Sequence, residues 1–239
     1  MTPSELLLPA GAIAFYLYDS LLWLFGDELV LIHGARRWSF AAGSDWLLLR
    51  RRLYLPNPFT PQQLLWRACW SAASQVGEPT DLAAQAAVWG LLRPMRVLVL
   101  VLLALIVVAL PALVAGGATP LWLLALLAAI YLVAGVAVAW IWRHQVALGL
   151  SARACRALSF DAIACPPFAI NLVRKIALHT GVRGELLTQA RSVFEPAVLE
   201  QLRATLVRRV AEQLVVESAG SAAHTALSAY QRQLLEQQP

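Results

Sequence analysis

Two long hydrophobic stretches constrain the fold of this chain more than any other feature. Residues 95–115 are apolar after Arg96, and residues 121–142 carry no charge at all. A helix of roughly 20 apolar residues crosses the hydrocarbon core of a bilayer, which is about 30 Å thick. Lipid offers no hydrogen-bond partners, so such a segment must be helical to satisfy its own backbone. The sequence therefore predicts a transmembrane helical hairpin; a buried helix pair in a soluble protein fits these lengths poorly.

The residues around the two stretches predict how the hairpin is oriented. Residues 116–120 (GGATP) connect them, with glycines suited to end one helix and proline suited to begin the next. Arg93 and Arg96 precede the hairpin, Arg143 and His144 follow it, and the connection is uncharged. Because arginine and lysine collect on the cytoplasmic side of membrane proteins, we expect an outward-facing turn and two cytoplasmic flanks.

Composition supports a membrane protein and excludes several other classes. Hydrophobic residues make up 59% of the chain and charged residues 14%, against about 45–50% and about 25% in soluble domains. These values exclude a disordered chain. The net charge is +5, but the basic residues lie outside the long apolar runs, which favours anionic lipid over nucleic acid as the partner. The three cysteines (Cys69, Cys155 and Cys165) are widely spaced and odd in number, so we expect reduced thiols.

The N-terminal region, residues 1–25, contains a weaker hydrophobic segment. Residues 6–25 are nearly long enough to span a membrane, but they include Pro9 and Asp19. They lack the basic start of a signal peptide. The segment predicts either a third transmembrane helix or a helix at the membrane interface.

The remaining regions predict cytoplasmic structure on both sides of the hairpin. Residues 26–94 predict a small β-meander followed by helices. The expected strands are residues 28–33, 38–41, 46–49 and 52–55, and the expected helices are residues 60–70 and an alanine-rich helix that begins at Asp81. Residues 143–239 predict a helical region, with the clearest amphipathic helix starting at Pro196. The fold class is thus a mainly α integral membrane protein.

Motifs for catalysis and cofactor binding are missing from the sequence. It contains no phosphate-binding GxxxxGK[ST] or GxGxxG loop, no HExxH and no GxSxG. The cysteines and histidines are not spaced in the close pairs typical of zinc sites. We therefore expect no cofactor, no metal and, on balance, no enzyme.

Two groups of polar residues remain as candidate sites. Asp19 is the first, because a carboxylate inside a membrane is unfavourable unless it is paired, hydrated or protonated, and Tyr16 is placed to donate a hydrogen bond to it. A proton or ion relay would need further polar groups along a path, so a position near the interface or an ion pair with a partner is the better interpretation. Arginines that could contact anionic lipid form the second group: Arg36, Arg37, Arg50, Arg51 and Arg52.

These features together predict a multi-pass protein of a bacterial-type inner membrane with its C-terminus in the cytoplasm. The expected role is that of a non-catalytic scaffold, accessory or assembly subunit whose cytoplasmic surfaces bind partners. The alternative is a membrane-embedded enzyme or transport subunit that uses Asp19 and the nearby arginines. The expected partners are the lipid bilayer and another membrane subunit or a second copy of the chain, without nucleic acid.

Overall fold

The computed structural model describes residues 3–34, 37–49, 51–70, 90–180 and 186–236 of the 239-residue chain. They form two compact units, between which the chain passes several times. The helical unit comprises Met1–Leu21, Leu55–Leu64 and Ala83–Thr180, and the sheet unit comprises Leu22–Tyr54, Leu65–Leu82 and Gly181–Pro239.

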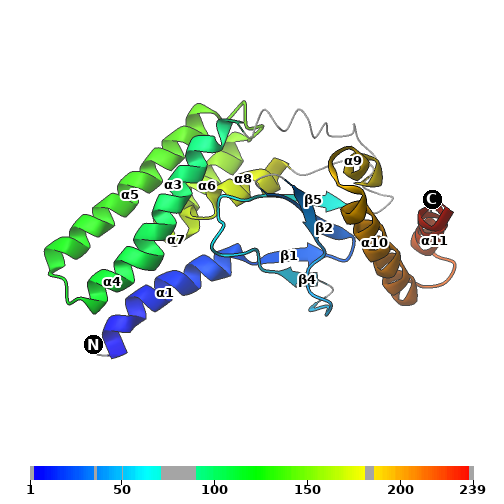
Figure 1. Ribbon diagram of the computed structural model, residues 1–239, viewed down its shortest axis with the longest axis horizontal. Coiled ribbons are helices and arrows are strands. Elements are labelled where there is room, and N and C mark those ends of the chain that lie inside the picture. The colour runs from blue at the N-terminus through cyan, green and yellow to red at the C-terminus, as the bar shows by residue number, and fades with distance from the viewer. Residues whose placement is uncertain (1–2, 35–36, 50, 71–89, 181–185, 237–239) are drawn as a thin grey trace. The chain divides into compact units, whose positions relative to one another are not determined.

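The predicted hairpin is present in the helical unit (Figure 1). Its first helix runs without a break through α3 (Arg93–Leu103), η2 (Ala104–Ala109) and α4 (Leu110–Ala115). Its second helix is α5 (Pro120–Arg143). The two are 23 and 24 residues long, and an 18-residue window in each has a mean hydropathy of 3.3 and 2.6, so both have the length and composition of membrane spans.

A proline explains why the first helix changes its hydrogen bonding in the middle. Segment η2 is π-helical, and the N–H of Leu110 donates to the carbonyl of Leu105, five residues earlier. Pro111 follows directly; it has no N–H, and its ring crowds the carbonyl of Val107. A wider turn just before the proline removes this conflict, as π-bulges commonly do.

The turn of the hairpin matches the expectation from sequence. The N–H of Ala118 donates to the carbonyl of Leu113 and that of Gly117 to Val114, which is a Schellman motif. Gly117 has φ +65°, a conformation that glycine adopts without strain. Pro120 then occupies the first turn of α5, where its missing N–H is not needed.

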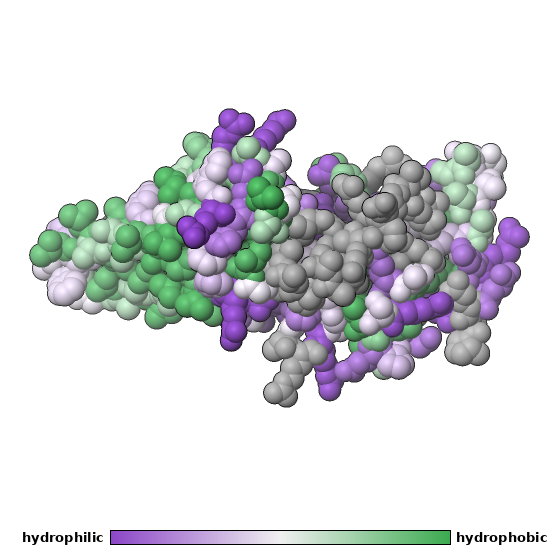
Figure 2. Space-filling model, turned by 90° about the horizontal axis from the view of Figure 1, so that it is seen from above, coloured by the Kyte–Doolittle hydropathy of each residue, from purple (hydrophilic) through white to green (hydrophobic). Residues whose placement is uncertain are grey.

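Most of the apolar surface of the hairpin is left uncovered by the residues that the structure describes. Only 17% of the most apolar window of the first long helix and 22% of that of the second are buried. Buried contacts run along one face of each helix: Met95, Val99, Leu102 and Ile106 on the first, and Leu126, Ile130, Ala134, Ala137 and Ile141 on the second. Figure 2 shows hydrophobic residues covering the end of the helical unit that holds α4 and the start of α5.

The N-terminal helix α1 (Pro3–Ser20) is shorter than the segment predicted at residues 6–25. Residues Leu22–Phe25 leave the helix and form strand β1, in which Leu24 is fully buried. Helix α1 lies beside η2 and α4 and also contacts α7 (Figure 1). Its apolar part, Leu6–Ser20, is shorter than the two helices of the hairpin, so a membrane crossing by this segment stays a prediction.

The described part of the helical unit also contains α6 (Ala152–Ala164), α7 (Pro166–Ala169) and α8 (Leu172–Thr180). Ser151 caps α6 by accepting a hydrogen bond from the N–H of Ala154. The break between α6 and α7 falls at Cys165, directly before two prolines. These helices agree with the helical character expected after residue 143.

The sheet unit contains two small sheets, in which the pairs β1–β4 and β2–β3 are antiparallel. Strand β1 (Leu22–Phe25) pairs with β4 (Arg51–Tyr54), and the order β3–β2–β5 forms a three-stranded sheet from Trp38–Ala41, Glu28–His33 and Leu64–Cys69. The strands predicted at 28–33 and 38–41 are confirmed, and the one predicted at 52–55 is shifted by one residue. Residues 46–49 do not form the predicted strand; only Leu48 makes an isolated bridge, to Arg51.

One predicted helix is wrong. The segment expected to be helical at residues 60–70 contains β5, whose residues Leu64, Leu65 and Trp66 are all buried in succession. A short apolar run of this kind is compatible with either structure by periodicity alone, and burial of successive residues is typical of a strand covered on both faces. The alanine-rich helix predicted from Asp81 lies outside the described residues.

Three helices follow in the sheet unit: α9 (Leu186–Val193), α10 (Pro196–Val216) and α11 (Ala222–Glu236). Helix α10 begins at the proline expected from sequence and packs against both α9 and α11. Leu202, Leu206 and Val210 are fully buried on one of its faces. The ring of Tyr230 on α11 stacks on Trp70, which follows β5, at 6.1 Å between centroids.

Candidate functional site

The first candidate site is a polar cluster in the helical unit, which we call the Asp19 cluster. Its members are Asp19 and Ser20 at the end of α1, Asp161 on α6, and Asn171, Arg174 and Lys175 at the start of α8. Asn171, Arg174 and Lys175 are three and four residues apart, so their side chains share one side of a helical turn. This spacing directs all three toward the end of α1.

Lys175 is the centre of the ion pairs in this cluster. Its Nζ lies 2.8 Å from Oδ1 of Asp19 and 3.0 Å from Oδ2 of Asp161. The same ammonium group stands 5.0 Å from the centre of the Phe168 ring, within the range of a cation–π interaction. Asp19 thus has its counter-ion within its own unit, supplied by the only lysine of the chain.

Asn171 and Arg174 extend the cluster by hydrogen bonds. Asn171 Nδ2 donates to Oδ2 of Asp19 at 3.0 Å and to Oγ of Ser20 at 3.0 Å. The buried guanidinium of Arg174 donates to the carbonyl oxygens of Asn57 and Thr60, at 2.6 and 2.8 Å. The cluster therefore ties the end of α1 to α8 and to the segment around residues 57–60.

The geometry corrects the predicted role of Tyr16. Its side chain is buried, but its hydroxyl donates to the carbonyl oxygen of Pro58 and not to Asp19. The two acids and two bases of the Asp19 cluster balance each other in charge. Such an arrangement holds α6, α8 and the end of α1 together.

The partners of Asp19 are not among the site residues predicted from the sequence. Asp161, Asn171, Arg174 and Lys175 were not singled out, although a lysine that occurs once in 239 residues is itself a signal. Their role depends on a contact between residues more than 150 positions apart, which no local pattern reveals.

The predicted lipid-binding arginines have different surroundings. Arg36 and Arg50 lie outside the described residues. Arg37 is exposed and pairs with the exposed Glu195 at 3.3 Å. Arg51 is exposed, and its guanidinium lies 4.7 Å from the centre of the Phe25 ring. Arg37 and Arg51 thus remain accessible to a ligand.

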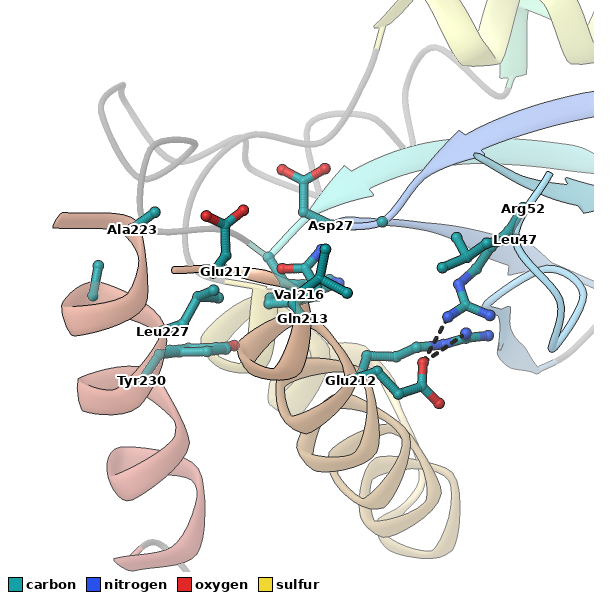
Figure 3. A pocket seen from close by; sticks show the side chains of 14 residues that line it. Asp27, Leu47, Arg52, Glu212, Gln213, Val216, Glu217, Ala223, Leu227 and Tyr230 are labelled. Carbon is teal, nitrogen blue, oxygen red and sulfur yellow. Dashed lines mark hydrogen bonds and ion pairs between the residues drawn. The ribbon is translucent and has the colours of Figure 1, made fainter. Parts of the chain in front are cut away.

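Arg52 does not belong with the lipid-binding arginines, because its side chain is only 4% exposed. Its Nη2 lies 2.6 Å from Oε2 of Glu212 on α10, and Arg209 Nη1 reaches the same oxygen at 3.3 Å (Figure 3). Arg52 also donates to the carbonyls of Ser44 and Asp45. We call Arg52, Arg209 and Glu212 the arginine clamp, because it holds the 42–45 loop against α10.

A pocket of about 440 Å³ lies beside the arginine clamp in the sheet unit. Helices α10 and α11 contribute apolar walls, including Val216, Leu227 and Tyr230. The carboxylates of Asp27 and Glu217 stand apart from the arginine clamp in Figure 3. The volume is within the range of small-ligand pockets, about 300–1,000 Å³, and the lining combines apolar walls with a few charged groups.

The cysteines show no sign of reactivity. Burial, with the nearby charges of Asp27 and Glu28, raises the pKa of the Cys69 thiol to about 11, and burial also raises the pKa values of Cys155 and Cys165. These thiols remain protonated at neutral pH, and the thiol is the unreactive form. Within the described ranges, no three His, Cys, Asp or Glu side chains are placed to hold a metal ion.

Comparison with known proteins adds no functional information: no family model matches the chain, and no curated protein or solved structure is similar to it.

Proposed function

We propose that this chain is a multi-pass integral protein of a bacterial-type inner membrane that acts as a non-catalytic scaffold, accessory or assembly subunit. The observation that carries this proposal is the hairpin of two long apolar helices, most of whose surface is left exposed by the described part of the chain. In water, exposing so much apolar surface would be unfavourable, and the protein would tend to aggregate. In a bilayer the same surface contacts the lipid acyl chains, which are apolar as well.

Residues near the ends of the hairpin support its placement across a membrane. Trp122 near the start of α5 and Trp142 near its end are both exposed, as are aromatic residues in the interfacial belts of membrane proteins. Arg93, Arg96 and Arg143 flank the hairpin at the end opposite the uncharged turn. This distribution supports a turn outside the cell and a cytoplasmic C-terminus.

The balanced Asp19 cluster supports a scaffold over an enzyme or transport subunit. The alternative function requires Asp19 to act on a substrate, proton or ion, but its two carboxylate oxygens already accept from Lys175 and Asn171. The sheet unit, which includes the C-terminal helices, then supplies surface for binding partners. The partners that we propose are the bilayer and another membrane subunit.

Mild detergent extraction of a tagged copy from its native membrane tests this proposal. We expect a second membrane protein to co-purify at a fixed stoichiometry, because an accessory subunit functions only in its complex. The control is an unrelated tagged multi-pass protein from the same membrane, which should not bring the same partner. Recovery of this chain alone, as a monomer or a homo-oligomer, would contradict the role of accessory subunit.

A further inference from the structure

The sheet unit displays a short loop of four consecutive large apolar residues, which we call the Trp46 loop (residues 46–49). The exposed fractions are 80% for Trp46, 51% for Leu47, 55% for Leu48 and 87% for Leu49. Leu47 also lines the pocket of the sheet unit. A single exposed leucine is ordinary on a protein surface, but Trp46, Leu48 and Leu49 together form an apolar patch of the kind that marks a binding surface.

The base of the Trp46 loop is fixed in place. Leu48 and Arg51 exchange two backbone hydrogen bonds, of 2.8 and 3.0 Å, that close a tight turn containing Leu49. The carbonyl of Trp46 accepts a hydrogen bond from Ser44 Oγ. The buried Arg52 holds the carbonyls of Ser44 and Asp45. The apolar side chains are thus presented on a rigid base.

The backbone at Leu49 is strained in a way that points to a function. Leu49 has φ +52°, in the left-handed region where glycine and asparagine are favoured and a branched side chain is uncommon. Two-residue turns of hairpins usually carry Asn-Gly or a similar pair for this reason. A leucine in this conformation destabilises the backbone, and its side chain is exposed, so burial of the side chain does not offset the cost. Strain of this kind is commonly retained where the side chain has a task outside the fold.

Charge and composition favour the bilayer as the occupant. Arg51 lies two residues after Leu49 and is exposed, with its guanidinium beside the ring of Phe25. A tryptophan and leucines next to arginines match the interfacial layer of an anionic membrane, where aromatic rings sit at headgroup level and each arginine adds attraction to anionic lipid. A protein surface would have to provide both a deep apolar groove and acidic groups.

We propose that the Trp46 loop inserts into the headgroup region of an anionic bilayer and that Arg51 binds a lipid phosphate. This inference rests on the proposed hairpin, which keeps the sheet unit tethered to a membrane and so raises the effective concentration of lipid around the loop. The loop then serves as a second, reversible membrane contact of the cytoplasmic part of the chain.

A fluorescent probe at the tip of the loop tests this proposal in the full-length chain. Leu49→Cys is labelled with an environment-sensitive dye after Cys69, Cys155 and Cys165 have been replaced by alanine. The protein is reconstituted in phosphatidylcholine vesicles with or without phosphatidylglycerol. Glu200→Cys, at an exposed position on α10, is the matched control. We expect several-fold stronger quenching of the Leu49→Cys label by brominated lipid chains than of the control, and stronger quenching with phosphatidylglycerol.

Two further variants separate insertion from damage to the fold. Leu49→Gly, probed with a label at Leu48→Cys, should reduce the lipid quenching without lowering thermal stability, because glycine accepts the left-handed conformation. Arg51→Ala should remove most of the dependence on phosphatidylglycerol.

Two results would overturn the inference. The first is a Leu49→Cys label that aqueous iodide quenches as strongly as the control while the chain floats with the vesicles. The second is a label that becomes shielded from aqueous iodide only when another protein is added, and not when lipid is present. That result would assign the loop to a protein partner. A chain that fails to float would instead contradict the proposed hairpin, so the two failures are distinguishable.

Discussion

Lys175→Met should destabilise the helical unit by about 3 kcal/mol, because it leaves the largely buried Asp19 without its counter-ion. Asp19 is 11% exposed, so water cannot replace the lost ammonium fully. The nearby carboxylate of Asp161 loses the same partner, and the two acids then repel each other. The measurement is the thermal unfolding midpoint of the detergent-solubilised protein, compared with that of the parent chain.

A double-mutant cycle tests whether the ion pair causes this loss. Asp19→Asn also breaks the pair, but it keeps a side chain of similar shape beside Asn171. The double variant, Asp19→Asn with Lys175→Met, removes both charges and should be less destabilised than the sum of the single variants, by about 1–3 kcal/mol. Strict additivity would contradict a direct interaction between Asp19 and Lys175.

The same Asp19→Asn variant separates the two proposed functions. Loss of stability and of membrane abundance is expected if Asp19 holds helices together. Normal abundance and stability with a lost cellular activity would instead favour the membrane-embedded enzyme or transport subunit.

Arg209→Met should destabilise the sheet unit by about 2–3 kcal/mol. The buried Arg209 donates to Glu212 and to the carbonyl of Ala42, so its removal leaves acceptors of the 42–45 loop without a donor. Arg208→Met is the matched control, because this neighbouring arginine is half exposed and its ion pair, with the exposed Asp45 at 3.2 Å, is exposed as well. An exposed pair contributes about 0–1 kcal/mol, so the control should be nearly neutral.

Limited proteolysis of the reconstituted chain measures both variants in the sheet unit. We expect faster cleavage near residues 42–45 in Arg209→Met and unchanged cleavage in Arg208→Met. Equal behaviour of the two variants would show that the arginine clamp does not hold this loop.

The hairpin could be predicted from sequence because its signal is local. Length and the absence of charge decide whether a segment can cross a membrane, and Gly117 and Pro120 mark the turn through their own backbone preferences. Strands β2 and β3 were predictable for a similar reason, since each is a short apolar run beside a turn.

The misjudged elements depend on contacts between distant parts of the chain. Strand β1 continues a hydrophobic helix in sequence and is extended because it pairs with β4. Strand β5 has leucines and a tryptophan that suit either structure, and its place beside β2 decides between them. The candidate sites also depend on distant contacts. In the sequence Arg52 is indistinguishable from its exposed neighbour Arg51, but in the structure it is buried against Glu212, which lies 160 residues further along the chain.

The orientation of the hairpin is the most direct test of the account. Thr119→Cys places a thiol in the exposed turn, and Val146→Cys places one in the exposed segment after α5. Both are made in a chain whose native cysteines are replaced by alanine and are exposed to a membrane-impermeant maleimide in bacterial spheroplasts. We expect Thr119→Cys to react at once and Val146→Cys to react only after permeabilisation. Reaction of the two cysteines on the same side of the membrane would contradict a hairpin that spans it.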